Sequence, residues 1–121
     1  MIRDVTDLEV YRLSLELLKE LYEFLKKVPV TEYDSVKQCK KCGKSIPANL
    51  AEGFAKRNSE KEFKRFQMIS LGSSDELITH LRTIVIAVPR LEEEANLLAG
   101  KYKVLSKRLN KLHQNWRTGY F

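Results

Sequence analysis

Long apolar segments and cysteines are scarce in this sequence, and both absences narrow the class of protein. No hydrophobic run approaches the roughly 20 residues that a membrane-spanning helix needs. The first ten residues, MIRDVTDLEV, carry acids where a secretory signal needs a basic and then an apolar stretch. Two cysteines without such a signal indicate free thiols in a reducing compartment. We therefore expect a cytoplasmic protein that does not associate with membranes.

Patterns that mark enzymes are missing as well. The motifs do not assemble a Ser-His-Asp set, a glycine-rich phosphate loop or a glycosidase-like pair of acids. Glu52 and Glu76 do not belong to the paired Glu-x-x-His motifs of a di-iron bundle, because Glu76 and His80 are four residues apart and no second copy exists. We expect a non-catalytic protein without a cofactor.

Cys39 and Cys42 form a single CxxC, which we interpret as structural. A zinc site needs about four ligands, but there is no second CxxC, and His80 and His113 stand alone in the sequence. On a helix, cysteines three residues apart place two small apolar side chains on one face. We predict this packing role and no metal site, with metal binding and redox chemistry as the less favoured alternatives.

Helical periodicity extends over almost the whole sequence. Its 121 residues, 43% hydrophobic and 31% charged, fit one globular domain spanning residues 1–121. Alternating β-branched runs and Asn-Gly hairpins are missing. Apolar spacing and boundary residues predict four helices, from Thr6 to about Lys27, Glu32 or Ser35 to Arg57, about Glu60 to Val88, and Pro89 to Trp116. Short connections between them predict an all-α, antiparallel up-down-up-down four-helix bundle.

Capping residues at two helix starts and a regular apolar stripe in the last helix support this assignment. Capping boxes mark two helix starts, Thr6 with Glu9 and Ser59 with Glu62. In the last helix the apolar residues alternate steps of four and three, as in a coiled coil. That seam consists of Leu91, Ala95, Leu98, Tyr102, Leu105, Leu109, Leu112 and Trp116.

The first helix carries more apolar surface than one bundle core usually needs. Its two apolar stripes are centred about 120° apart and cover roughly 200° of the helix. One explanation is a helix packed deeply between two neighbours of the same chain. The explanation that we favour places the second stripe against another subunit. That stripe consists of Val10, Leu13, Leu17, Leu21 and Phe24.

The stretch SIPANLAEG, residues 45–53, puts a proline inside the second helix. Pro47 lacks an N–H and its ring crowds the carbonyl of Gly43, so we predict a kink in the helix and a freed carbonyl that needs a donor. The candidate donors are Ser45, Asn49 and Ser70. The alternative is that Pro47 ends one helix and starts another.

Small residues accompany this proline. Counting outward from the turn at Asn58, antiparallel pairing of the second and third helices opposes small side chains at mid-length. The predicted pairs are Phe54 with Phe63, Pro47 with Ser70, and Gly43 with Ser73 or Ser74. We therefore expect these two helices to approach closely.

A set of short motifs runs through residues 7–85. It comprises Asp7-Leu8-Glu9-Val10, Gln38, SIPANLAEG with Lys56-Arg57, Glu62, Phe66, Gly72-Ser73 and Glu76-Leu77. Together these motifs resemble the 23S rRNA intervening-sequence protein family of bacterial four-helix bundle proteins. The structural motif residues that the resemblance marks are Ser45, Pro47, Asn49, Glu52, Gly53, Gly72, Ser73 and Glu76.

The resemblance implies an antiparallel bundle that assembles as a ring-like homopentamer and has no established enzymatic activity. Some family members are encoded inside insertions within 23S rRNA genes. A distant relative of similar shape, the accessory protein of diversity-generating retroelements, is a basic pentamer that binds a reverse transcriptase and nucleic acid. The implied partners are further copies of the chain and RNA or a nucleic-acid enzyme such as a reverse transcriptase.

Charge is distributed unevenly along the chain. Basic residues number 5 against 8 acidic ones in residues 1–34, 9 against 3 in 35–65, 2 against 5 in 66–100, and 6 against 0 in 101–121. The basic segments contain three clusters, which we take as candidate nucleic-acid contacts. They are Lys37, Lys40, Lys41 and Lys44; Lys56, Arg57, Lys61, Lys64 and Arg65; and Lys107, Arg108 and Lys111.

These observations favour one function over another. We expect a non-catalytic, oligomeric helical scaffold that binds RNA or an RNA-associated protein through a basic face. Few aromatic side chains are interleaved with the lysines, so contacts to phosphates would dominate such binding. The alternative is a structural or protein-partner adaptor without affinity for nucleic acid, in which the lysines only keep the bundle soluble.

Overall fold

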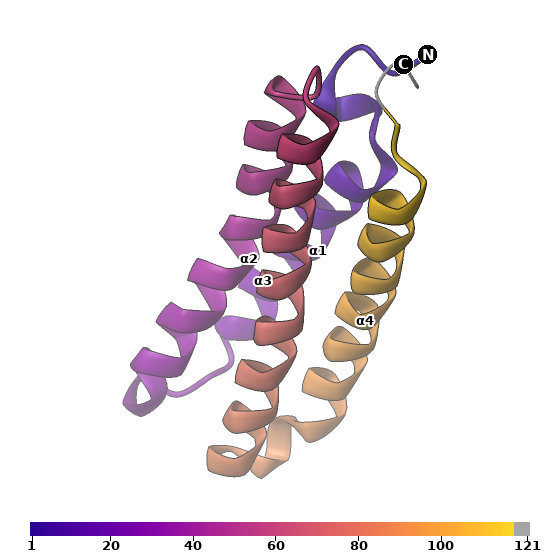
Figure 1. The fold of residues 1–121 in the computed structure, drawn as a ribbon. Coiled ribbons are helices and arrows are strands. Elements are labelled where there is room, and N and C mark those ends of the chain that lie inside the picture. The colour runs from indigo at the N-terminus through magenta and orange to yellow at the C-terminus, as the bar shows by residue number, and fades with distance from the viewer. Residues whose placement is uncertain (118–121) are drawn as a thin grey trace.

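Four long helices make up most of the chain in a computed structural model, which describes residues 1–117 (Figure 1). They are α1 (Glu9–Leu25), α2 (Tyr33–Ala55), α3 (Glu60–Ala87) and α4 (Glu92–Asn115). Short 3₁₀ turns precede three of them: η1 (Val5–Asp7), η2 (Val30–Glu32) and η3 (Pro89–Leu91). The described residues contain no strand. The all-α prediction is confirmed.

The helices alternate in direction and form a closed bundle (Figure 1). Each packs against the next in sequence, and α4 returns to pack against α1. The α2–α3 contact is the most extensive and the α1–α4 contact the least extensive of these four. Within residues 1–117, no helix has the length and apolar character that a bilayer crossing requires.

The apolar residues predicted for the fourth helix form its buried side. Seven of the eight seam residues are buried, and the exception, Leu112, is partly buried. Near the α2–α3 turn, the ring of Phe63 contacts Phe54 and Trp116 edge-to-face, with centroids 5.8 Å and 4.7 Å apart. The predicted pairing of Phe54 with Phe63 is therefore confirmed.

The assignment of the second stripe of α1 to a subunit surface is wrong. Its residues face the core of the single chain: Val10, Leu17, Leu21 and Phe24 are buried there, and Leu13 is partly buried. The physical reason is that α1 lies against both α2 and α4, so that two neighbours cover a wide apolar arc. Both stripes contribute to one core. In the other stripe, which consists of Leu8, Tyr11, Leu15, Leu18, Tyr22 and Leu25, the most exposed residue is Leu15, at 39%.

The start of α1 also differs from the prediction. The capping box lies one turn earlier, where Asp4 accepts from the Thr6 amide at 3.1 Å and Asp7 accepts from the Asp4 amide at 3.0 Å. These bonds cap η1, and α1 then begins at Glu9. At α3 the predicted cap is present, because the Ser59 hydroxyl accepts from the Glu62 amide at 3.2 Å.

Pro47 lies inside a continuous helix, so the alternative of two separate helices is excluded. The N-terminal half of α2 diverges from α3 (Figure 1). Two expected donors act on carbonyls other than that of Gly43. The Asn49 amide donates to the Ser45 carbonyl at 2.8 Å, and the Ser70 hydroxyl donates to the Ile46 carbonyl at 3.0 Å. The latter bond ties α2 to α3 beside the proline.

The two glycines of α2 lie against different helices. A Cβ atom at Gly43 would lie 2.7 Å from Leu21 Cδ2, so this glycine faces α1 and not α3 as predicted. A Cβ atom at Gly53 would lie 2.4 Å from the Cβ atom of Phe66. The close approach of α2 and α3 therefore depends on Gly53, while Gly43 lets α1 approach α2.

We predict that Gly53→Ala destabilises the protein more than Gly43→Ala does. At Gly53 the methyl group meets a Cβ atom fixed to the α3 backbone, whereas at Gly43 it meets the flexible end of a leucine. Overpacking of a core typically costs about 1–3 kcal/mol, and we expect Gly53→Ala to fall in this range. Urea unfolding followed by circular dichroism measures the difference.

Gly72→Ala is the matched control. Nothing lies within 4 Å of a Cβ atom at Gly72, so alanine there should stabilise α3 by up to about 1 kcal/mol through helix propensity. If Gly53→Ala were as stable as wild type, the close α2–α3 approach at this position would be refuted.

Candidate nucleic-acid interface

The first basic cluster occupies the solvent-facing side of α2. Its apolar stripe, which includes Cys39, Cys42 and Ile46, is buried in the bundle, so the lysines between these residues point outward. All four lysines are exposed and line one open hollow of about 930 Å³. This surface, which we call the α2 lysine face, consists of Lys37, Lys40, Lys41 and Lys44.

The α2 lysine face forms no ion pair in the part of the chain that the structure describes, although Lys41 lies close enough to Glu76 to lower the pKa of its carboxyl. Among residues 1–117, none of its ammonium groups takes part in an ion pair. Lys40 Nζ lies 5.5 Å from the centre of the Tyr22 ring, a contact that leaves its charge in place. Like charges at i, i+3 and i+4 on a helix repel each other. The face therefore has an unfavourable self-interaction that a bound anion would relieve.

The second basic cluster, at the α2–α3 turn, is partly neutralised. Lys56 and Arg65 both lie over the Phe66 ring, 4.9 Å and 4.4 Å from its centre. Lys56 also approaches Glu52 at 4.0 Å, and Arg65 pairs with Glu62 at 3.2 Å. Hydrogen bonding to Arg65 lowers the pKa of the Glu62 carboxyl. These two cations are thus already engaged within the chain.

The rest of this cluster is mixed. The Arg57 guanidinium lies 4.1 Å from the centre of the Phe54 ring and donates to the Phe54 carbonyl at 3.1 Å. Lys61 is exposed and Lys64 is partly buried. The turn cluster offers fewer free cations than its sequence indicates.

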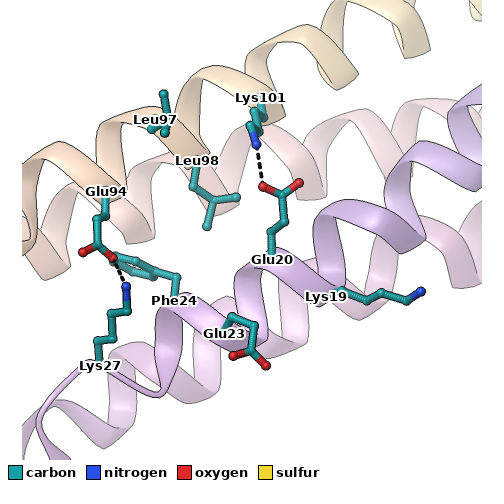
Figure 2. A pocket seen from close by; sticks show the side chains of 9 residues that line it. All are labelled: Lys19, Glu20, Glu23, Phe24, Lys27, Glu94, Leu97, Leu98 and Lys101. Atoms are coloured by element: carbon teal, nitrogen blue, oxygen red, sulfur yellow. Dashed lines mark hydrogen bonds and ion pairs between the residues drawn. The ribbon is translucent and has the colours of Figure 1, made fainter.

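Two basic residues of α4 pair with acids of α1. Lys101 pairs with Glu20 at 2.5 Å, and Arg108 pairs with Glu9 (Figure 2 shows the first pair). Acids of the negative first segment therefore neutralise part of the positive charge of the last segment. Two further basic residues of the predicted cluster, Lys107 and Lys111, are exposed. Of the three clusters, the α2 lysine face retains the most uncompensated charge.

Several of the motif residues lie along the α2–α3 contact. The hydroxyls of Ser45 and Ser73 are hydrogen-bonded at 2.8 Å, and Asn49 also donates to the Ser45 hydroxyl at 2.9 Å. Gly53 provides the close approach described above, whereas Gly72 is exposed. Ser45, Ser73, Asn49 and Gly53 therefore fasten α2 to α3, whereas Gly72 makes no such contact.

One group of polar residues was not predicted. Cys42 Sγ donates to Glu76 Oε2 at 3.1 Å, and His80 Nε2 lies 3.2 Å from the same oxygen. The pairing register counted from Asn58 could have revealed this group, since it places position 42 of α2 opposite positions 74 and 75 of α3, next to Glu76. Cys42 and His80 lie far apart in the sequence, on two different helices.

The sequence matches the model of one known protein family. The family model described as 23S rRNA-intervening sequence protein matches residues 6–111. The chain belongs to this family. The matched segment includes α1, α2 and α3 completely and most of α4, so the resemblance predicted from the motifs is confirmed. A comparison with curated proteins finds no match.

Both cysteines are buried free thiols, and we predict that they are unreactive in the folded protein. Burial raises the pKa of the Cys39 thiol to about 12, and burial and the hydrogen bond to Glu76 raise that of Cys42 to about 12. At pH 8 a disulfide reagent such as DTNB should label neither thiol natively and both in denaturant. Rapid native labelling of both would contradict the burial.

The same shifts predict a dependence of stability on pH. Thiols of the unfolded chain ionise near pH 8.5 or so, while the folded pKa values are higher. The stabilisation is therefore complete below this pH and is lost as the pH rises toward 12. We therefore expect the urea midpoint of unfolding to decrease between pH 7.5 and pH 10. The decrease should be smaller for the double variant Cys39→Ser, Cys42→Ser than for wild type, because serine does not titrate in this range.

Proposed function

We propose that this protein is a non-catalytic scaffold that binds RNA through the α2 lysine face. The observation that carries the proposal is the cluster of four exposed lysines on one hollow without an ion-pair partner in residues 1–117. Phosphate groups would relieve the repulsion among these lysines and release counterions. The family description, which refers to 23S rRNA, is consistent with a nucleic-acid partner.

The chemistry of this face favours backbone contacts over base recognition. Lysine ammonium groups are flexible point charges, which contact phosphates but read little sequence. The aromatic residues lining the hollow are limited to Tyr33, at its end. Binding would therefore depend strongly on salt and weakly on base composition.

We further propose that the chain forms a homo-oligomer through the surface beside the α1–α4 contact. On α4, Leu97 and Val104 are 68% and 43% exposed and two turns apart, with Gly100 between them. Leu97 points away from α1, whereas Leu98 points toward it (Figure 2). Two hollows, of about 430 and 270 Å³, run along this surface. An oligomer would repeat the α2 lysine face in every subunit, and the family resemblance implies five subunits.

The RNA proposal predicts that RNA affinity depends more on the lysines of α2 than on those of α4. Replacing Lys37, Lys40, Lys41 and Lys44 by glutamine should weaken binding of a mixed RNA pool at least tenfold, with unchanged helicity by circular dichroism. The slope of log K against log salt should fall by about 3, because four phosphate contacts to single strands are removed. Fluorescence anisotropy at several salt concentrations measures both quantities.

The matched control replaces four lysines of α4, Lys101, Lys103, Lys107 and Lys111, by glutamine. It changes the net charge equally but leaves the α2 lysine face intact, so it should retain most of the affinity. Equal losses in both variants would assign binding to net charge and not to α2. No salt-sensitive binding by the wild type would refute the scaffold and favour the protein-partner adaptor.

The oligomer proposal predicts that Leu97→Lys with Val104→Lys yields smaller species by light scattering while the chain remains helical. Both side chains are exposed in the single chain, so the charges do not enter its core. Leu17→Lys is the contrasting variant, because Leu17 is buried and its replacement should unfold the protein instead. A wild type that is monomeric at micromolar concentration would refute assembly.

A further inference from the structure

We propose that Cys42, Glu76 and His80 form a Zn²⁺-binding site on the α2–α3 contact. Each offers one ligand atom, and the three atoms lie within 4.8 Å of one another. They provide a thiolate, a carboxylate and an imidazole, all of which are established zinc ligands. The three ligands are not members of the α2 lysine face, although Lys41 of that face lies close enough to act electrostatically on Cys42 and Glu76, and the proposal does not depend on RNA binding.

The distances fit the edges of a zinc coordination sphere. With bond lengths of about 2.0–2.3 Å, tetrahedral ligands lie roughly 3.3–3.6 Å apart. Glu76 Oε2 is already 3.1 Å from Cys42 Sγ and 3.2 Å from His80 Nε2. Small rotations of the partly buried imidazole and of the exposed carboxylate would bring all three to bonding distance. Their side chains are 24% and 60% exposed.

The helices hold these ligands in place. Glu76 and His80 are four residues apart on α3 and therefore lie on one face of it, a spacing that zinc sites on helices use. Cys42 comes from α2, and the hydrogen bond between Ser45 and Ser73 fastens the two helices one turn away. The ligand set therefore joins two elements whose register is already fixed.

The charges and the access also suit a divalent ion. A thiolate and a carboxylate together carry two negative charges, which balance Zn²⁺, while the imidazole binds as a neutral ligand. Binding replaces the proton that Cys42 donates to Glu76 by a sulfur–zinc bond, and that proton passes to solvent. Glu76 opens the site to the surface, so a small ion can reach a thiol that is itself almost fully buried.

The donor set favours zinc over other common ions. Magnesium and calcium prefer sites made of oxygen atoms, whereas a thiolate and an imidazole suit Zn²⁺ and its spectroscopic substitute Co²⁺. Three protein ligands leave one position for water or an external donor, as in open zinc sites.

The test uses Co²⁺ added to the chelator-treated, reduced protein, followed by Zn²⁺. We expect a thiolate-to-cobalt charge-transfer band and intense visible bands of tetrahedral coordination, both abolished by excess Zn²⁺. Cys42→Ser should remove the charge-transfer band, and Glu76→Gln and His80→Gln should each weaken Co²⁺ binding at least tenfold. In the wild type, Zn²⁺ should raise the melting temperature.

Matched controls separate this site from unspecific binding. Cys39→Ser and His113→Gln change the same residue types outside the cluster and should keep the band. Because Cys42 is buried, the surface variants Glu76→Gln and His80→Gln decide the result if Cys42→Ser does not fold. The proposal is overturned if the wild type gives no charge-transfer band, or if folded Glu76→Gln and His80→Gln bind Co²⁺ as tightly as wild type.

Discussion

The close contact between α2 and α3 is the constraint on which the rest of the structure depends. At Gly53 the two helices approach so closely that even a methyl group would collide with Phe66. Hydrogen bonds from Ser70 to the Ile46 carbonyl and between Ser45 and Ser73 then fix their register. Because this register is fixed, the outward direction of the α2 lysines and the meeting of Cys42 with Glu76 follow from the sequence of each helix.

Contacts within the chain neutralise different fractions of the charge in its different parts. Acids of α1 pair with basic residues of α4, and the cations near the α2–α3 turn lie on aromatic rings or beside glutamates. Such surface pairs contribute little to stability, but they cancel local charge. Among the predicted clusters the α2 lysine face keeps the largest number of exposed cations without an ion pair in residues 1–117, which is why the proposed function rests on that helix and not on the net charge.

Much of the fold follows from residue patterns, because the helix boundaries and the antiparallel register are local properties. The turn at Asn58 correctly predicted that Phe54 meets Phe63. The rotation of each helix about its own axis, which decides the neighbour that each face contacts, was harder to predict. It depends on packing against several helices at once. Gly43 was assigned to α3 but faces α1, and the second stripe of α1 is covered by the chain itself. Periodicity shows that a stripe is buried; it does not show what buries it.

The α1–α4 contact has a consequence for the order of folding. Two ion pairs bridge it, Glu20 with Lys101 and Glu9 with Arg108, and a third, Lys27 with Glu94, lies just beyond the end of α1. Their partners are 81, 99 and 67 positions apart in sequence, whereas α2 and α3 are joined by a tight turn. Closing a long loop costs more chain entropy than closing a short one, and the α1–α4 contact is also the least extensive of the four. We therefore expect the α2–α3 hairpin to form early and α1 to dock last, so that α1 is also the helix that detaches first when the native bundle opens locally.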